Sequence, residues 1–261
     1  MKIAILGAGA YGRALGKIVS NNGHDLDFYD PKVCPGVTLE QATKNAEAII
    51  ICIPSNFLPS FLEDYPSELK TLPTFLASKG LGDVKFFKDF TNFAVLSGPT
   101  FAQEIMDGKQ SMLTATNQLA VDIFSNQQIE IEVCQDIQGV VLCGSLKNAY
   151  AIGAGFNSDS ENAVAALLVK AHAEMKDYLL NHGANPDTAE LACGIGDLIL
   201  TCSSETSRNY TCGKKLHSGQ NLDDILTELE TVEGINALHE LDITDDYPIL
   251  MHIARIAGLK K

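Results

Sequence analysis

Short apolar runs alternate with helical segments along the first half of the chain. Runs rich in apolar and β-branched residues predict strands at positions 2–6, 26–29, 48–53, 74–77 and 93–97. A stretch with helical spacing, residues 11–22, follows the first of them. Alternation of this kind predicts crossover connections and a parallel sheet. Strand-like runs at 111–116 and 129–133, on either side of a helical stretch at 119–125, would extend that sheet.

The second half of the chain has a different pattern. Residues 140–151 and 163–180 carry apolar side chains at helical spacing, and strand-like runs become scarce. An acidic turn precedes a last predicted helix at 249–257. We therefore predict an α/β fold in which a Rossmann-type parallel-sheet domain, residues 1–136, is followed by a mostly α-helical domain, residues 137–261.

Composition and charge narrow the class of protein. A chain of 261 residues, 46% of them hydrophobic, can bury a full core, and a net charge of -14 argues against a nucleic-acid surface. No apolar run approaches the roughly 18 residues of a membrane-spanning helix, and no secretory signal follows Met1. The 7 cysteines form no CxxC pattern and no Cys/His cluster with zinc spacing. We expect a cytoplasmic protein with free thiols, no membrane span and no metal site.

Three glycines form a GxGxxG pattern, Gly7, Gly9 and Gly12, between the first predicted strand and the first predicted helix. This is the context that the dinucleotide-binding fingerprint requires. The first glycine permits a tight turn, the second lets a pyrophosphate approach the backbone, and the third lets the helix pack closely on the strand. The alternative interpretation is a glycine-rich turn without a ligand.

Asp30 ends the second predicted strand, about 20 residues beyond the glycines, where a carboxylate can accept hydrogen bonds from the adenosine ribose. Such a carboxylate would repel the additional phosphate of NADP, whereas Lys32 would partly offset this repulsion. We therefore predict NAD as the cofactor, with NADP possible. The competing interpretation of Asp30 is a turn-starting residue before Pro31.

Four motifs occur in a fixed order along the chain. They are GAGAYG at 7–12, SKG at 78–80, GSLKNAYAIGAG at 144–155 and GIGDLILTCSSETSRN at 194–209. Together they resemble the NAD(P)-dependent glycerol-3-phosphate dehydrogenases of the bacterial type, and the resemblance runs from residue 2 to about residue 233. It implies reversible hydride transfer between NAD(P)H and dihydroxyacetone phosphate, which gives sn-glycerol 3-phosphate for phospholipid synthesis. It also implies a homodimer.

Reduction of a ketone requires a proton donor, and a lysine can serve as that acid. Lys147 is our candidate, because it matches the Lys-Asn pair of the family, although most lysines lie on exposed helix faces. We expect Asp197 to hold Lys147 by a charge-assisted hydrogen bond. The alternative role is the N-cap of a helix that begins at Leu198, and both roles could coexist. Thr201, one turn further along, would face the same side, and the resemblance places it in the catalytic set.

Phosphate binding is assigned to Arg208 and Asn209, because a guanidinium matches two phosphate oxygens and an amide can donate to a third. A surface ion pair is the alternative for Arg208. The resemblance puts Ser207 beside the substrate, Arg208 near the cofactor as well, and Lys79 near both substrate and cofactor. It counts Lys79 among the catalytic residues too.

The remaining matches line the expected site. The resemblance places Gly98 and Thr100 near the substrate. It places four residues near the cofactor: Ala10, Tyr11, Ala102 and Glu233. Tyr11 stands where bacterial members often have Trp, and Thr231 replaces an apolar residue in the TVEG segment at 231–234.

Two alternative functions stay open at this point. Related two-domain hydroxyacid dehydrogenases share the glycine fingerprint and a catalytic lysine, but their asparagine follows about one helical turn later, whereas Lys147 and Asn148 are adjacent. A catalytically idle, nucleotide-sensing relative would have no evident need for Lys79, Lys147, Asp197 and Arg208 together.

Overall fold

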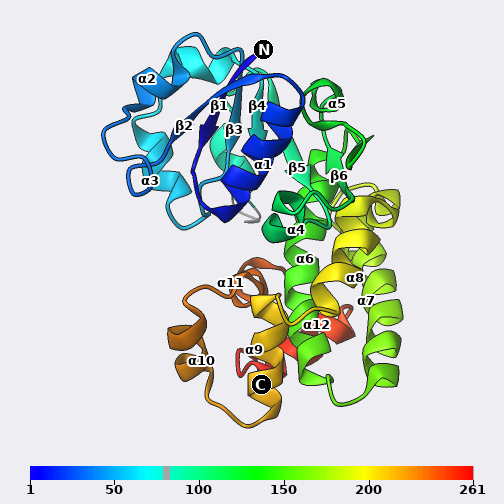
Figure 1. Ribbon diagram of the computed structural model, residues 1–261. Helices are drawn as coiled ribbons and strands as arrows, with labels where there is room; N and C mark the ends of the chain where they lie inside the picture. The colour runs from blue at the N-terminus through cyan, green and yellow to red at the C-terminus, as the bar shows by residue number, and fades with distance from the viewer. Residues whose placement is uncertain (79–82, 261) are drawn as a thin grey trace. The chain divides into compact units, whose positions relative to one another are not determined.

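The chain folds into two compact units, Met1–Ile137 and Gln138–Lys261. The computed structural model describes residues 1–78 and 83–260 (Figure 1). The first unit is built on a seven-stranded sheet and the second is helical, which confirms the predicted fold class. Lys79 lies outside the described residues.

The sheet of the first unit has the strand order β2-β1-β3-β4-β5-β6-β7. Its strands are β1 (Lys2–Leu6), β2 (Asp25–Tyr29), β3 (Ala48–Ile51), β4 (Thr74–Leu76), β5 (Phe93–Ser97), β6 (Ser111–Ala115) and β7 (Ile129–Val133). The chain leaves β1 toward β2 and then returns to place β3 on the other side of β1. In open α/β sheets, ligands bind outside the carboxyl ends of the strands at such a reversal.

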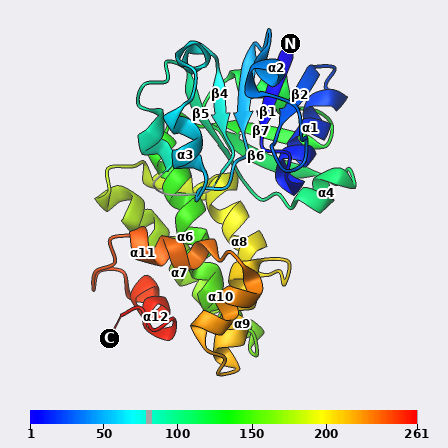
Figure 2. The same cartoon turned by 90° about the vertical axis from the view of Figure 1, so that its left-hand side faces the viewer.

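Helices cover both faces of the sheet, and each face has its own core. One core joins the β1 residues Ile3 and Ile5 to α1 (Ala10–Asn21), α4 (Ala102–Met106) and α5 (Leu119–Phe124). The other joins Ala4 and Leu6 to α3 (Leu58–Glu63) and the 3-10 turns η1 (Ser67–Thr71) and η2 (Asp83–Phe87). The short α2 (Leu39–Thr43) follows β2. Figures 1 and 2 show α1 and α3 on opposite faces.

One strand pair departs from the predicted parallel sheet. Strand β6 runs antiparallel to β5, with Leu96 opposite Ala115 and Ser97 opposite Thr114, while all other neighbours are parallel. The link between Ser97 and Ser111 contains the 5-residue α4, after which the chain returns antiparallel to β5.

The second unit is organised around one buried helix, α6 (Ile137–Phe156), whose neighbour in sequence is α7 (Glu161–Asn181). The other helical segments are η3 (Pro186–Glu190), the π-helical turn η4 (Ala192–Gly196), α8 (Asp197–Cys202), α9 (Arg208–His217), α10 (Leu222–Leu229), α11 (Glu233–Glu240) and α12 (Pro248–Ile256). Figure 2 shows α6 passing through the middle of this unit.

Glycines allow the backbones of two helices to come into direct contact with the backbone of α6. A Cβ on Gly213 of α9 would lie 2.0 Å from the carbonyl oxygen of Ile152. A Cβ on Gly234 of α11 would lie 2.4 Å from the carbonyl oxygen of Asn148. Any side chain would push the helices apart, so Gly213 lets α9 pack on α6 at Ile152 and Gly234 lets the first turn of α11 pack on α6 at Asn148.

No helix among residues 1–78 and 83–260 has the length and apolar character needed to cross a membrane. The same residues contain no group of three or more His, Cys, Asp or Glu arranged to bind a metal ion.

Candidate functional site

The three glycines of the fingerprint have different surroundings. Gly7, with a φ of +104°, follows β1, and a Cβ there would lie 2.8 Å from the carbonyl carbon and oxygen of Cys52. A Cβ on Gly12 would lie 1.9 Å from the carbonyl oxygen of Gly7. Gly9, at the N-cap of α1, has no atom within 4 Å of its Cβ position. The first and third glycines therefore serve packing, whereas the open space at Gly9 fits phosphates bound at the helix N-terminus.

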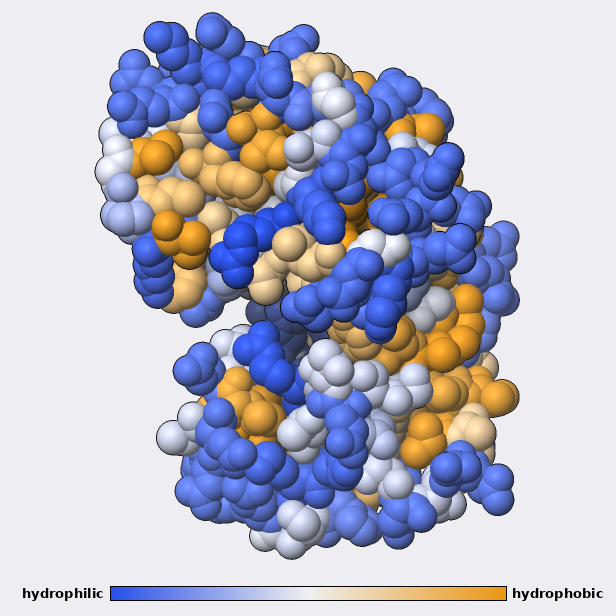
Figure 3. All heavy atoms as spheres, viewed as in Figure 1, coloured by the Kyte–Doolittle hydropathy of each residue, from blue (hydrophilic) through white to orange (hydrophobic). Residues whose placement is uncertain are grey.

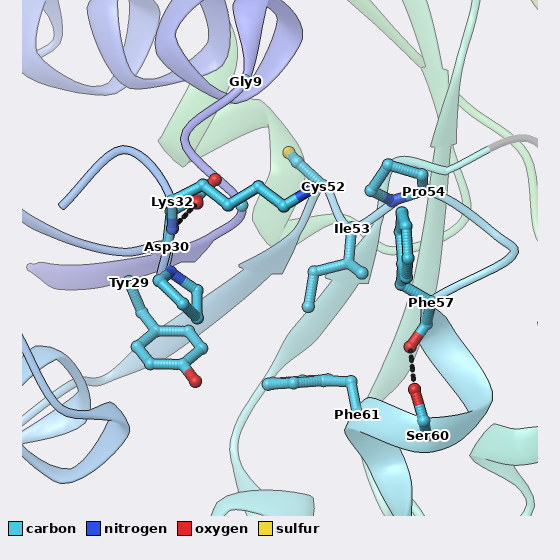
Figure 4. Close-up of a pocket in the computed structure, with 12 residues that line it drawn as sticks. Gly9, Tyr29, Asp30, Lys32, Cys52, Ile53, Pro54, Phe57, Ser60 and Phe61 are labelled. Atoms are coloured by element: carbon cyan, nitrogen blue, oxygen red, sulfur yellow. Dashed lines mark hydrogen bonds between the residues drawn. The ribbon is translucent and has the colours of Figure 1, made fainter. Parts of the chain in front are cut away.

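A pocket of about 430 Å³ lies beside this loop, at the carboxyl ends of β1, β2 and β3 (Figure 4). It is lined by Gly7, Gly9, Tyr29, Asp30, Pro31, Lys32, Cys52, Ile53, Pro54, Phe57, Ser60 and Phe61. Figure 3 shows hydrophobic side chains exposed over β2 and α3 on this unit, with hydrophilic ones around them. An apolar slot with few charged groups suits a purine base and its ribose.

Asp30 joins the glycine loop to the turn that follows β2. Its Oδ2 accepts a hydrogen bond from the Ala8 N–H at 2.8 Å, and its Oδ1 accepts from the N–H groups of Lys32 and Val33 at 2.9 and 3.1 Å. Burial by itself raises the pKa of Asp30, but these donors and the Lys32 ammonium outweigh it, so the pKa lies below its usual value. Asp30 thus connects the glycine loop to the turn after β2 by hydrogen bonds, and it is also a candidate ribose ligand.

The predicted substrate loop of the first unit is tied to the start of α1. The Tyr11 hydroxyl and Thr100 Oγ1 are 3.0 Å apart, and Thr100 Oγ1 donates to the Gly98 carbonyl at 3.2 Å. A Cβ on Gly98 would lie 2.7 Å from the Met112 carbonyl oxygen, so a side chain would displace this loop from β6. Ala10 and Ala102 are the first residues of α1 and α4.

Lys147, Asp197 and Thr201 form a closed hydrogen-bonded triangle in the second unit. Lys147 Nζ donates to Asp197 Oδ1 at 3.0 Å and to Thr201 Oγ1 at 2.9 Å. Thr201 Oγ1 donates in turn to Asp197 Oδ1 at 3.1 Å. The three residues are 4%, 1% and 4% exposed. Charged groups this deeply buried need each other, because an unpaired charge in the interior is costly.

The alternative role of Asp197 as a helix cap is wrong. The helix α8 begins at Asp197 itself, its N-cap is Gly196, and the π-helical turn η4 runs directly into it. Asp197 therefore lies within a continuous helical run instead of at its start. The wide turn brings Gly194 against η3, where a Cβ would lie 2.2 Å from the Ala189 carbonyl oxygen.

A second chain of hydrogen bonds starts at Asn148, next to Lys147. The amide nitrogen of Asn148 donates to Glu233 Oε2 at 3.1 Å, and its oxygen accepts from the Asn209 amide nitrogen at 2.9 Å. The Asn209 oxygen accepts from the Gly234 N–H at 2.8 Å. Asn209 and Glu233 were predicted from sequence, but the connecting role of Asn148 was not. The adjacent Lys-Asn pair was the available signal.

The predicted phosphate-binding residues lie at the start of α9. Ser207 is its N-cap, with Oγ accepting from the Tyr210 N–H at 3.3 Å, and it is buried. Asn209 is buried too, within the network of Asn148. Arg208, the first residue of the helix, is exposed. A guanidinium at the positive end of a helix is well placed to bind an anion.

Comparisons with known proteins cover nearly the whole chain. Family models described as the N-terminus and the C-terminus of NAD-dependent glycerol-3-phosphate dehydrogenase match residues 28–120 and 136–260. Glycerol-3-phosphate dehydrogenase [NAD(P)+] of Pseudomonas syringae pv. tomato is 31% identical, over 98% of this chain and 88% of that protein. The protein of the same name from Listeria innocua is 32% identical, over 98% and 91%.

Solved structures show the same fold. The crystal structure of glycerol-3-phosphate dehydrogenase from Coxiella burnetii superimposes with a TM-score of 0.81, at 23% identity, over 98% of this chain and 94% of that one. The resemblance that the motifs indicated is confirmed by these matches. The chain belongs to the NAD-dependent glycerol-3-phosphate dehydrogenase family.

Proposed function

We propose that this protein catalyses reversible hydride transfer between NAD(P)H and dihydroxyacetone phosphate, which gives sn-glycerol 3-phosphate. The observation that carries the proposal is the buried Lys147, held by Asp197 and Thr201 in a chain that also has a complete dinucleotide fingerprint. Membership in the family supports the same reaction. The product would serve phospholipid synthesis, and the enzyme would act in the cytoplasm as a homodimer.

The first unit would hold the cofactor. Gly9 leaves room for the pyrophosphate at the N-terminus of α1, where backbone N–H groups favour negative charge, and Gly7 and Gly12 let the turn and the helix pack closely around it. Asp30 would accept from the ribose hydroxyls, while Ala10, Tyr11 and Ala102 would line the cofactor at the starts of their helices. When bound, the nicotinamide supplies or takes the hydride.

Lys147 would act as the general acid. Two of its hydrogen bonds go to Asp197 and Thr201, which fix the direction of the ammonium and keep its proton available. In the reducing direction Lys147 Nζ would give a proton to the ketone oxygen, and in the oxidising direction it would take the hydroxyl proton back. Asp197 would stabilise the charged state of Lys147, and Thr201 would hold the carboxylate in place.

Substrate recognition would rest on cations and amides. Arg208 would bind two phosphate oxygens, with Ser207, Asn209 and Lys79 as further ligands. Gly98 and Thr100 would be further substrate-binding residues. Asn148 would act as a positioning residue, because it connects Asn209 of α9 to Glu233 of α11, which we place near the cofactor with Arg208 and Lys79.

The test is an assay of NADH and NADPH oxidation with dihydroxyacetone phosphate at neutral pH, with chiral analysis of the product. We expect turnover and formation of sn-glycerol 3-phosphate. Calorimetry with ADP would be run in parallel to show that the nucleotide site is intact. ADP binding without any turnover would support an idle nucleotide-sensing relative instead. Turnover with 2-oxo acids but not with the phosphorylated ketone would support a hydroxyacid dehydrogenase.

A further inference from the structure

The loop between β5 and α4 is held by side-chain hydrogen bonds on both sides. On one side, the Tyr11 hydroxyl in the first turn of α1 lies 3.0 Å from Thr100 Oγ1. Thr100 Oγ1 in turn donates to the Gly98 carbonyl at 3.2 Å. On the other side, Ser111 Oγ at the start of β6 donates to the Pro99 carbonyl at 2.7 Å. Three consecutive loop residues therefore have defined partners.

The direction of the hydrogen bonds at Thr100 follows from counting protons. A hydroxyl carries one proton and two lone pairs. The Gly98 carbonyl can only accept, so the Thr100 proton is used in that bond. Both hydrogen bonds of Thr100 then form together only if the Tyr11 hydroxyl donates to Thr100 Oγ1. One lone pair of Thr100 Oγ1 remains, and Thr100 can meet a ligand only as an acceptor.

Burial makes this direction selective. Thr100 is only 8% exposed, so little water can reach its hydroxyl. The Tyr11 ring packs against the apolar core formed by α1, α4 and α5, which holds its hydroxyl in place. A buried acceptor that a ligand leaves unpaired costs free energy, and a site of this kind rejects analogues that lack the matching donor.

Dihydroxyacetone phosphate offers one group of the required kind. Its ketone oxygen can only accept hydrogen bonds. Its phosphate monoester has lost most of its second proton at neutral pH, because the second pKa of such groups is about 6. The remaining polar group is the free hydroxymethyl group, whose hydroxyl can donate.

We propose that Thr100 accepts a hydrogen bond from the free hydroxyl of the ketone substrate, and that Tyr11 is the positioning residue that fixes Thr100 as an acceptor. Tyr11 thereby contributes to the choice of substrate through its hydroxyl. This role is separate from any contact of Tyr11 with the cofactor. The inference rests on the proposed function, since it concerns the substrate of that reaction.

Conservative variants separate the groups involved. Tyr11→Phe removes the hydroxyl and keeps the ring in the core. Thr100→Val replaces the hydroxyl with a methyl group of similar size, whereas Thr100→Ser keeps the hydroxyl. Ser111→Ala is the matched control, because it removes a hydrogen bond to the adjacent Pro99 carbonyl and leaves the partners of Thr100 unchanged.

The experiment compares two ligands that differ in one hydroxyl. They are dihydroxyacetone phosphate and hydroxyacetone phosphate, which has a methyl group in place of the free hydroxymethyl group. Each is titrated calorimetrically into the full-length protein saturated with NAD⁺, which has no hydride to give, so no turnover occurs. We expect the wild type to prefer dihydroxyacetone phosphate about 5- to 100-fold, the range for one unpaired buried acceptor.

The variants should change this preference in a defined order. Tyr11→Phe should lower it about 2- to 10-fold, which corresponds to one neutral hydrogen bond. Thr100→Val should remove most of it, and Thr100→Ser and Ser111→Ala should keep it. Because Tyr11 acts through Thr100, adding Tyr11→Phe to Thr100→Val should lower the preference no further.

Four results would overturn the proposal. They are a wild type that does not prefer dihydroxyacetone phosphate, an unchanged preference in Tyr11→Phe, an equal change in Ser111→Ala, and additive effects in the double variant. Failure of the dehydrogenase reaction is distinguishable from these, because binding is measured without turnover. The expected order of preferences in a protein that does not oxidise NADH would support the role of Tyr11 and reject the proposed function.

Discussion

Lys147 combines deep burial with a full set of polar neighbours. It is 4% exposed, and its ammonium contacts a carboxylate and a hydroxyl on α8. Ion pairs of this kind add little net stability, because desolvation offsets the attraction between the charges. Stability therefore does not explain why an ammonium is buried and oriented here, whereas a role as a general acid does.

We expect Lys147→Met to lower kcat by about 10² to 10⁴ or more, the contribution of a general acid, while ADP affinity stays within about twofold in calorimetry. The variant leaves Asp197 buried without its charge partner, which should cost about 3 to 5 kcal/mol of unfolding free energy. The double variant Lys147→Met/Asp197→Asn should recover part of this stability without recovering turnover. Activity in the double variant would contradict the assignment.

Arg208 can be tested separately from the buried residues, because it is exposed. Arg208→Lys keeps the charge but loses the two-pronged geometry. We expect the KM for dihydroxyacetone phosphate to rise about tenfold or more, equivalent to about 1.4 kcal/mol or more of lost binding. Steady-state kinetics at saturating NADH would measure this. An unchanged KM would place Arg208 outside the phosphate site.

At the scale of elements, one buried carboxylate links three helices of the second unit. Glu174 of α7 is 5% exposed and accepts from the N–H groups of Ile249 and Leu250, at 2.7 and 2.9 Å, in the first turn of α12. It also accepts from the Tyr150 hydroxyl of α6 at 3.2 Å. Burial raises the pKa of Glu174, and these donors lower it only in part.

The raised pKa of Glu174 has a definite consequence for stability against pH. The folded state holds the proton more tightly than the unfolded state, so this group contributes stability below the unfolded pKa of about 4.3 and loses it as pH rises through the folded value. We therefore expect the unfolding free energy of the wild type, measured by urea unfolding, to increase relative to that of Glu174→Gln as the pH is lowered from 7 to 4. A constant difference would contradict the raised pKa.

Glu174→Ala tests the same link in another way. It leaves two buried backbone donors and a buried hydroxyl without their acceptor, and each unsatisfied group costs about 1 to 3 kcal/mol. We expect a loss of about 3 kcal/mol or more in unfolding free energy at neutral pH, larger than the loss in Glu174→Gln. A smaller loss in the alanine variant would show that water replaces the carboxylate.

Strands and helices were predicted correctly where the spacing of apolar residues within one segment identifies the element. The strands at 93–97 and 129–133 match β5 and β7, and the helix predicted at 163–180 lies within α7. The helix predicted at 140–151 extends in the structure over Ile137–Phe156. Its ends were missed because α6 is buried nearly all round, so its apolar residues show no clear face. The direction of β6 was also missed, since periodicity predicts a strand but not its orientation.

At the scale of the whole molecule, the net charge of -14 opposes binding of polyanions. The candidate anion sites depend instead on local cations, such as Lys32 and Arg208. We expect no binding of single-stranded RNA or duplex DNA up to about 100 µM at 0.15 M salt, measured by fluorescence anisotropy, because nonspecific affinity depends on phosphate neutralisation. Saturable binding at low micromolar concentration would contradict this expectation and would indicate a local basic surface despite the negative net charge.

Sequence alone determined the order of the seven strands, the places of α1, α6 and α7, the change from an α/β to a helical pattern, the glycine fingerprint and the family. Each of these depends on residues close together in the chain, whose spacing can be read directly. Tertiary structure decided which polar residues meet. The pairing of Lys147 with Asp197, 50 positions away, was predicted, but the contacts of Asn148 with Asn209 and Glu233, across still longer separations, were not. Such contacts depend on how helices pack, and here glycines without side chains set the approach of α9 and α11 to α6.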